Sequence, residues 1–164
     1  MPNNARGITQ LQLAAIVACL GGMWMIRSFV IMPMLDRAQT QAEESAAIAS
    51  LRIIGSAELS YSTSSNSGFS SSLAELNRST SGQTGQAGEK ALDGELVSGL
   101  KNGYRYAYEP KYSASDGSSS YVSGFVITAD PLESTSQKRH FFMDQSLTIR
   151  ANRDHGAGPE DPPF

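Results

Sequence analysis

Apolar residues are concentrated in the first third of the chain, where few polar side chains interrupt them. Between Leu11 and Leu35 the only strongly polar side chains are those of Gln12 and Arg27. A helix needs about 20 apolar residues to cross a bilayer core of about 30 Å, so this stretch is long enough to span a membrane. Arg27 can reach the head groups along its own alkyl stem. Pro33 removes one backbone N–H and therefore predicts a kink.

Beyond the proline the pattern becomes that of an amphipathic helix. The segment "MLDRAQTQAEESAAIASLRII" has no Gly or Pro before Gly55 and is rich in strong helix formers. Ala47, Leu51, Ile54 and Tyr61 recur at three-, four- and seven-residue steps and form one apolar stripe. The helix is therefore predicted to continue to about Tyr61, and some fifty helical residues would span roughly 75–80 Å. Its stripe must pack on a domain of its own or on copies of itself.

The first third of the chain has three possible interpretations. A cleaved secretory signal has a basic start, an apolar run and then a small-residue cleavage site. Here the basic part is only Arg6, and the small residues near Ala46 follow the acidic pair Glu43 and Glu44, which is the wrong position for such a site. A plain N-terminal membrane anchor fits better. The third interpretation is an anchor that later serves as the shaft of an assembly.

The segment after the long helix is polar and rich in Ser, Gly, Asn and Thr, which predicts a loop. A short helical piece is expected within it at Ser71–Leu76, with a serine cap and Glu75 near its start. The segment Ser79–Glu89 has few apolar residues and is expected to be a loosely ordered surface connection.

The last third of the chain carries strand signals. "GYRYAYEPKY" alternates with a period of two, and the Asp116–Gly117 pair after it is typical of a hairpin turn. "YVSGFVITADP" predicts a second strand that ends at Pro131, and "KRHFFMDQSLTIRAN" predicts two short strands around a turn near Asp144–Ser146. Three or four antiparallel strands in succession make a meander whose apolar face can pack on the helix stripe. The predicted fold class is α+β, with the second half of a long helix packed on a small antiparallel sheet.

Composition excludes several classes of protein. The chain has 164 residues and a formal net charge of -3, which argues against a nucleic-acid partner because such proteins carry a basic patch. Cys19 is the single cysteine, so an internal disulfide and a Cys-rich metal site are both impossible. Its expected role is that of a packed or lipid-facing apolar side chain.

No set of residues predicts catalysis, a cofactor or a metal. His140 is expected to be a partly exposed sheet residue, and the Asp154–His155 pair lacks further ligands at a metal-binding spacing. "SASDGSSS" supplies only one carboxylate, whereas a calcium loop needs alternating oxygen ligands. The tyrosine row is expected to pack in the core, with an aromatic ligand-binding or electron-carrying surface as the alternative. This row consists of Tyr104, Tyr106, Tyr108 and Tyr112.

Two segments resemble the N-terminal region of type IV pilins and pseudopilins. "MPNNARG" followed by "ITQLQ" resembles a prepilin leader that ends in glycine, and "PMLDRAQTQAEESAAIASLRII" resembles the family's helix after its proline without a gap. The resemblance implies cleavage by a prepilin peptidase after Gly7 and methylation of Ile8 as the new N-terminus. The strand segments "GYRYAYEP", "FVITADP" and "RHFFMDQSLTIRAN" also resemble the C-terminal part of pilin-like proteins.

The chain departs from the family pattern at four positions. Ile8 replaces the usual Phe or Met, and Gln12 stands where the family has a glutamate that meets the charged N-terminus of a neighbouring subunit. Gln12 can hydrogen-bond an ammonium group but cannot neutralise it. Arg27 lies in a segment that the family keeps apolar, and either reaches lipid head groups or pairs with an acidic group of a neighbour. Pro33 falls about one helical turn later than usual.

The resemblance implies a structural subunit and not an enzyme. Such a subunit is a single-pass protein of the bacterial inner membrane with its C-terminal domain in the periplasm, and it assembles with copies of itself or other pilins into a pilus or secretion pseudopilus. The alternatives are an uncleaved, signal-anchored periplasmic binding module and a low-copy minor pilin. The expected organisation is a leader (1–7), a transmembrane and assembly half-helix (8–35), an amphipathic half-helix (36–63), a loop with a short helix (64–101), an antiparallel sheet (102–152) and an irregular tail (153–164).

Overall fold

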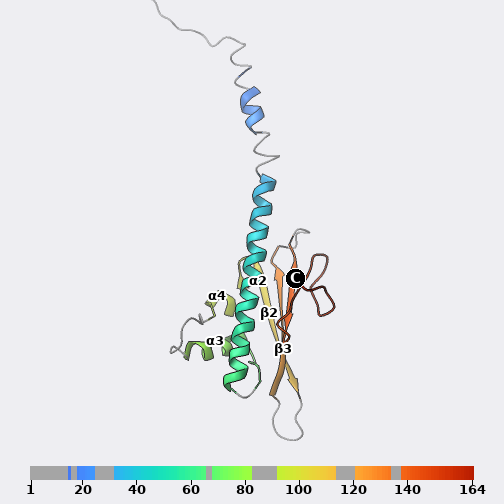
Figure 1. The fold of residues 1–164 in the computed structure, drawn as a ribbon. Helices are drawn as coiled ribbons and strands as arrows, with labels where there is room; N and C mark the ends of the chain where they lie inside the picture. Colours follow the sequence, from blue (N-terminus) through green and yellow to red (C-terminus); the bar gives the residue numbers. More distant parts are fainter. Residues whose placement is uncertain are drawn as a thin grey trace, which may run out of the picture. The chain divides into compact units, whose positions relative to one another are not determined.

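The computed structural model describes residues 15, 18–24, 32–65, 68–82, 92–113, 121–133 and 138–164. The chain divides into two compact units, Met1–Gln41 and Ala42–Phe164, which we call unit 1 and unit 2. Helix α2 begins in unit 1 and ends in unit 2 (Figure 1). Its bounds and those of the other elements are α2 (Met32–Ser65), α3 (Leu73–Gly82), α4 (Gly94–Val97), β1 (Leu100–Lys101), β2 (Tyr104–Ser113), β3 (Tyr121–Pro131), β4 (His140–Asp144) and β5 (Ile149–Asn152).

The described part of unit 1 is helical. It comprises residue 15, residues 18–24 and the first ten residues of α2. Every described side chain in it except that of Thr40 is exposed. No helix in the described part of the chain combines the length and the apolar character needed to cross a membrane.

Unit 2 contains an antiparallel sheet with the strand order β1-β2-β3-β4-β5. Each strand pairs with the next one in the chain, so the sheet is a meander. The longest pairing joins β2 to β3, from Tyr104 opposite Pro131 to Ser113 opposite Tyr121, with a register shift between Lys111 and Tyr112. The long helix and this sheet confirm the predicted α+β class.

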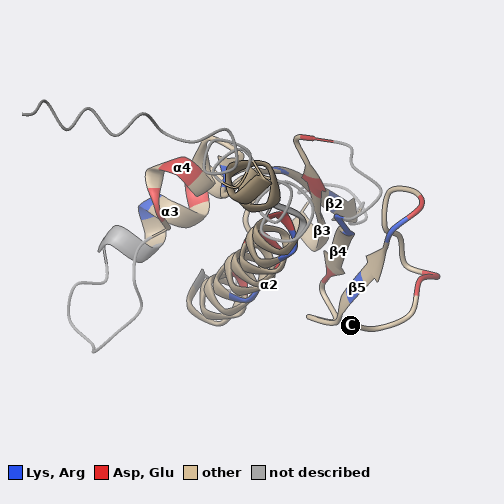
Figure 2. Cartoon of the chain, turned by 90° about the horizontal axis from the view of Figure 1, so that it is seen from above, with Lys and Arg blue, Asp and Glu red and all other residues tan. Residues whose placement is uncertain are grey.

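The core of unit 2 lies between α2 and one face of the sheet. Ala47, Leu51 and Ile54 of the predicted stripe are fully buried, and Tyr61 packs partly buried against them. The sheet contributes inward-facing side chains from β2, β3 and β4, because alternate residues of a strand point to the same face. Seen from above, α2 lies between the strands and the α3–α4 segment (Figure 2). The buried sheet residues are Tyr104, Tyr106, Phe125, Ile127, Ala129, Phe141 and Met143.

Four elements differ from the sequence prediction, among them helix α4 (Gly94–Val97), which was not predicted. Helix α2 ends at Ser65 and not near Tyr61, and α3 continues to Gly82, so residues 79–82 of the predicted surface connection are helical. Residues 83–89 of that connection lie outside the described residues. In α3 the hydroxyl of Ser79 donates to the carbonyl oxygen of Leu76 at 2.7 Å, three residues earlier in the same helix, so this polar side chain is hydrogen-bonded within α3. Strand β1 was not predicted, because two residues are too few to show a period.

The turn between β4 and β5 lies close to α2 at Gly55. A Cβ atom at Gly55 would approach Leu147 Cδ2 to 3.1 Å and Met143 Cε to 3.3 Å. Leu147 itself has a φ of 60°, the left-handed region that bulky side chains rarely occupy. The glycine inside α2 therefore permits the close approach of this turn, at a helix position where glycine is otherwise unfavourable.

Candidate functional site

The residues predicted to direct processing and assembly lie at the beginning of the chain. Gly7, Ile8, Gln12 and Arg27 are outside the described residues. Pro33 is the second residue of α2. A kink caused by Pro33 would lie in the helical turn before it. Residues 29–31 of that turn are outside the described part of the chain.

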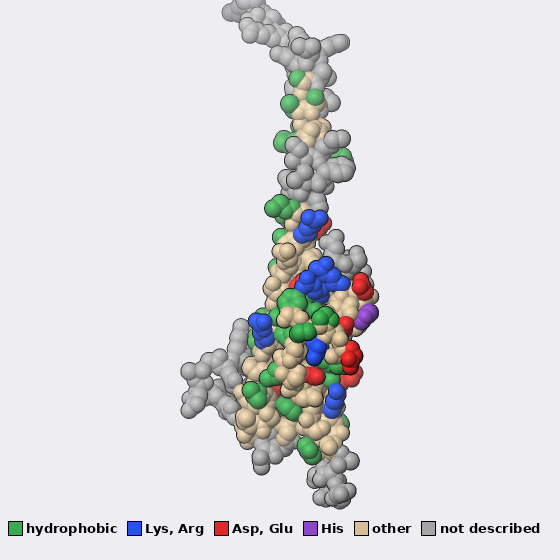
Figure 3. All heavy atoms as spheres, turned by 45° about the vertical axis from the view of Figure 1, so that its right-hand side comes forward, with side chains coloured by type: hydrophobic (Ala, Val, Ile, Leu, Met, Phe, Trp, Pro, Cys, Tyr) green, Lys and Arg blue, Asp and Glu red, His purple; other side chains and the backbone are tan. Residues whose placement is uncertain are grey.

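The described part of unit 1 exposes large apolar side chains. Trp24 and Met34 are each 73% exposed, and Leu35 is 62% exposed. Leu20 and Met23 are exposed as well, and hydrophobic side chains are visible along the described residues of this segment (Figure 3). Cys19 is also exposed in the described part of unit 1. Exposed apolar residues grouped in this way are typical of a surface that contacts a partner or a membrane.

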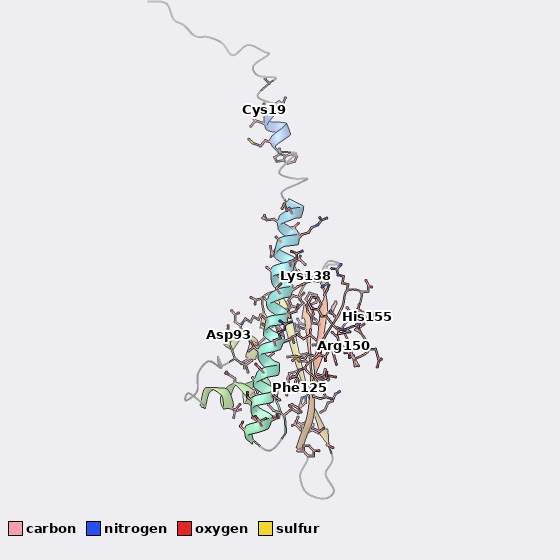
Figure 4. All side chains as sticks on the ribbon, in the orientation of Figure 1. Cys19, Asp93, Phe125, Lys138, Arg150 and His155 are labelled. Atoms are coloured by element: carbon pink, nitrogen blue, oxygen red, sulfur yellow. The ribbon has the colours of Figure 1, made fainter. Side chains whose placement is uncertain are left out.

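In unit 2 two acidic residues of α2 pair with two basic residues that precede β4. Lys138 Nζ lies 2.7 Å from Glu43 Oε2. The backbone N–H of Arg139 donates to Glu44 Oε1 at 3.0 Å, and the Arg139 guanidinium lies 3.9 Å from Glu44 Oε2. Figure 4 shows Lys138 beside α2. These four residues fasten α2 to the sheet close to the start of unit 2.

A further acidic residue of α2, Glu58, is fully buried at 0% exposure. The backbone N–H of Ser70 donates to Glu58 Oε2 at 3.0 Å, and the Ser70 hydroxyl donates to Glu58 Oε1. The Tyr108 hydroxyl lies 2.7 Å from Glu58 Oε1 and 2.8 Å from the Ser70 carbonyl oxygen. A buried carboxyl group needs hydrogen-bond partners, and those of Glu58 join the loop after α2 to the helix and to β2.

Glu75 fastens the next residue of the same loop. It accepts hydrogen bonds from the Ser71 backbone N–H at 2.9 Å and from the Ser71 hydroxyl, while the Tyr61 hydroxyl donates at 2.8 Å. The Ser71 hydroxyl and backbone N–H, followed by Tyr61, hold the pKa of Glu75 below its ordinary value. The Ser72 hydroxyl accepts from the Glu75 backbone N–H, as the predicted serine cap requires.

The tyrosine row of β2 divides into two parts. Tyr104, Tyr106 and Tyr108 belong to the core or pack against it, as predicted, and burial raises the pKa of each phenol. The Tyr104 hydroxyl donates to the Arg139 carbonyl oxygen at 3.0 Å. The packing prediction is wrong for Tyr112, which is 58% exposed, because α2 ends at Ser65 and the strand continues past the register shift.

His140 is a partly exposed residue of β4, as predicted. Its Nδ1 lies 2.6 Å from Asp130 Oδ1 on β3. His155 accepts at Nε2 from the Asn152 amide and donates from Nδ1 to the Gly156 carbonyl oxygen. Across the described ranges, no three His, Cys, Asp or Glu side chains are grouped so that they could hold a metal ion.

No pattern in the sequence predicted the polar contacts that hold the elements of unit 2 together. Glu58 lies in the apolar stripe, four residues after Ile54 and seven after Leu51. This position is the one sign in the sequence that a carboxyl group is buried in the core. A carboxylate on the buried face of a helix requires donors from elsewhere in the fold. Its partners Ser70 and Tyr108 are 12 and 50 residues away in the chain, so no local pattern could identify them.

Comparisons with protein-family models, with curated proteins and with solved structures found no match.

Proposed function

We propose that this chain is a structural subunit of a pilin-like filament, either a type IV pilus or a secretion pseudopilus. The observation that carries the proposal is the contrast within α2. Its later residues bury an apolar stripe against an antiparallel meander, whereas Met34 and Leu35 near its start expose apolar side chains. An exposed apolar segment joined to a packed domain suits a subunit that exchanges a bilayer for contacts with other copies.

The proposed roles follow the resemblance of the N-terminal segment. Gly7 and Ile8 are the processing residues, at which a prepilin peptidase cleaves the leader and methylates the new N-terminus. Gln12 is proposed to set the register between subunits by hydrogen-bonding a neighbour's N-terminal ammonium group. Arg27 and Pro33 are proposed to belong to the same assembly segment, where Arg27 reaches lipid head groups or pairs with an acidic group of a neighbour and Pro33 kinks the helix. The subunit would lie in the bacterial inner membrane until it joins an extracellular filament.

The decisive experiment is the mass of the N-terminus after co-expression with a prepilin peptidase. The proposal expects loss of residues 1–7 and a methylated Ile8. Gly7→Val should retain the leader, whereas the matched control Gly22→Val should be processed normally. A wild-type chain that still begins at Met1, or lacks only Met1, would contradict the proposal.

That contradicting result would favour the uncleaved periplasmic module, to which Gln12 and Arg27 are better suited than to a typical major pilin. A processed chain that is recovered only in trace amounts from sheared filaments would instead identify a minor pilin. Quantitative mass spectrometry of the sheared filaments measures how much of the chain they contain and so separates a minor from a major subunit.

A further inference from the structure

The last strand of the sheet, β5, is covered on its open side by the end of the chain. The Ala151 backbone N–H donates to the Pro162 carbonyl oxygen at 3.4 Å, and the Phe164 N–H donates to the Ile149 carbonyl oxygen at 2.9 Å. Arg150 and Pro163 form an antiparallel bridge between these two bonds. The segment 153–164, expected to be an irregular tail, forms this isolated bridge near its end, where it runs along β5.

Side chains hold this end segment in place. Arg150 Nη1 donates to the Asp161 carbonyl oxygen at 2.6 Å, and Asn152 Nδ2 donates to Asp161 Oδ1 at 2.6 Å. The Phe164 ring packs edge-on against Phe141, with ring centroids 5.7 Å apart, and Arg139 lies 5.1 Å from its centroid. Figure 4 shows Arg150 and His155 on this side of the sheet.

The outward edge of this segment is poor in hydrogen-bond donors. Because the Arg150–Pro163 pair lies between the two inter-strand bonds, the backbone N and O atoms of Pro163 point away from β5. Proline has no N–H, so this position has nothing to donate. The next outward N–H, that of Asp161, already donates to the Gly158 carbonyl oxygen at 3.2 Å. From Asp161 to Pro163 the outward edge therefore offers no free N–H.

The opposite edge of the sheet also has a proline on its outward side. The Tyr106 N–H donates to the Gly99 carbonyl oxygen at 2.8 Å, so Tyr106 faces away from β3. Since the direction alternates along a strand, Pro110 also faces outward, beyond the two residues of β1. Proline on the outward side of an edge strand prevents another strand from pairing there.

We propose that residues Asp161–Phe164 act as a strap that closes the β5 edge against strand addition by a second copy of the chain. An open strand edge is a template for pairing with an identical edge, and two β5 edges can meet in an antiparallel manner. Because Pro163 has no N–H, the strap covers β5 without offering a new strand edge with which another chain could pair. The inference is independent of the proposed function, because it concerns unit 2 alone.

The test compares two proline substitutions in the full-length chain, purified in detergent. Pro163→Val restores an outward N–H, whereas Pro162→Val, its matched control, restores an inward N–H that faces β5. Self-association is measured by sedimentation velocity over a range of concentrations, with wild type as the baseline. Pro163→Val is expected to associate about tenfold more tightly than wild type, because each copy gains an edge hydrogen bond. Pro162→Val is expected to match wild type.

Removal of residues 162–164 should expose β5 and raise self-association further, with new intermolecular β-sheet absorption in the infrared amide I band. If the truncated chain unfolds, the two valine variants decide, because both keep the anchoring Asp161 and Phe164. Equal association of Pro163→Val, Pro162→Val and wild type would overturn the proposal.

Discussion

Helix α2 contains two regions that differ in what surrounds them. Between residues 34 and 41 every side chain but that of Thr40 is exposed, whereas from Ala42 onward one face of the helix is buried against the sheet. The sequence is strongly helical throughout, so helix propensity does not distinguish the two regions. Packing and buried polar contacts, and not helix propensity, therefore determine which part of α2 contributes to the stability of unit 2.

The chain carries natural probes for this comparison. Trp24, its single tryptophan, lies in unit 1, and all six tyrosines lie in unit 2. Tyrosine near-ultraviolet circular dichroism therefore follows the unfolding of unit 2, while tryptophan fluorescence follows the surroundings of unit 1. All variants would be measured in the full-length chain, purified in detergent.

The largest effect is expected from Phe125→Ala. Phe125 is fully buried, its ring stacks on Tyr108 with centroids 5.9 Å apart, and it meets Phe69 edge-on at 5.2 Å. Loss of this ring should lower the free energy of unfolding of unit 2 by about 3–5 kcal/mol. The control Leu132→Ala removes an exposed side chain and should change it by less than about 0.5 kcal/mol. Equal effects of the two variants in denaturant titrations would contradict the described core.

Glu58→Leu should lower the free energy of unfolding by about 2–4 kcal/mol, because it leaves the Ser70 N–H buried without its acceptor and removes the acceptor that the Tyr108 hydroxyl shares with the Ser70 carbonyl oxygen. A double-mutant cycle with Tyr108→Phe sharpens the test. The two changes share one interaction, so the double variant should lose less stability than the sum of the single variants. Strict additivity in chemical denaturation would show that the two side chains do not interact.

A smaller, pH-dependent effect is expected at Glu75. The pKa of this carboxyl lies below its ordinary value in the folded chain, so its contribution to stability is present above that value and is lost as the pH falls through the folded pKa. Glu75→Gln should therefore flatten the fall in melting temperature between about pH 5 and pH 3. The exposed Glu109→Gln serves as the control and should retain the wild-type slope. An unchanged slope in Glu75→Gln would contradict the assigned contacts.

The smallest effect on stability is expected from Leu35→Ser. Leu35 is exposed, so the free energy of unfolding of unit 2 should change by less than about 0.5 kcal/mol. If the proposed function holds, the same variant should reduce the yield of assembled filaments, measured by shearing and immunoblotting. A marked loss of the tyrosine signal on mild heating would instead place Leu35 among the contacts that stabilise unit 2.

The sequence predicted the elements with a strong period and missed those whose partners are distant. The segment "YVSGFVITADP" predicted β3 at Tyr121–Pro131, the bounds that the structure has, and the apolar stripe predicted the buried face of α2. The bond between Glu58 and Tyr108 and the closeness of Gly55 to Leu147 depend on chain topology, which no local pattern encodes. The bridge at Pro163 was not predicted because Gly and Pro residues indicate a loop, although a proline also suits the outermost position of a sheet.

The loop after α2 has a consequence for how the protein can be made. Glu58 and Glu75 fasten its consecutive residues Ser70 and Ser71 by hydrogen bonds, where many small exported domains would use a disulfide. Unit 2 contains no cysteine, since the single one, Cys19, lies in unit 1. Its folding therefore needs neither an oxidant nor a disulfide isomerase, and it should reach the same structure in a reducing bacterial cytoplasm as in an oxidising compartment.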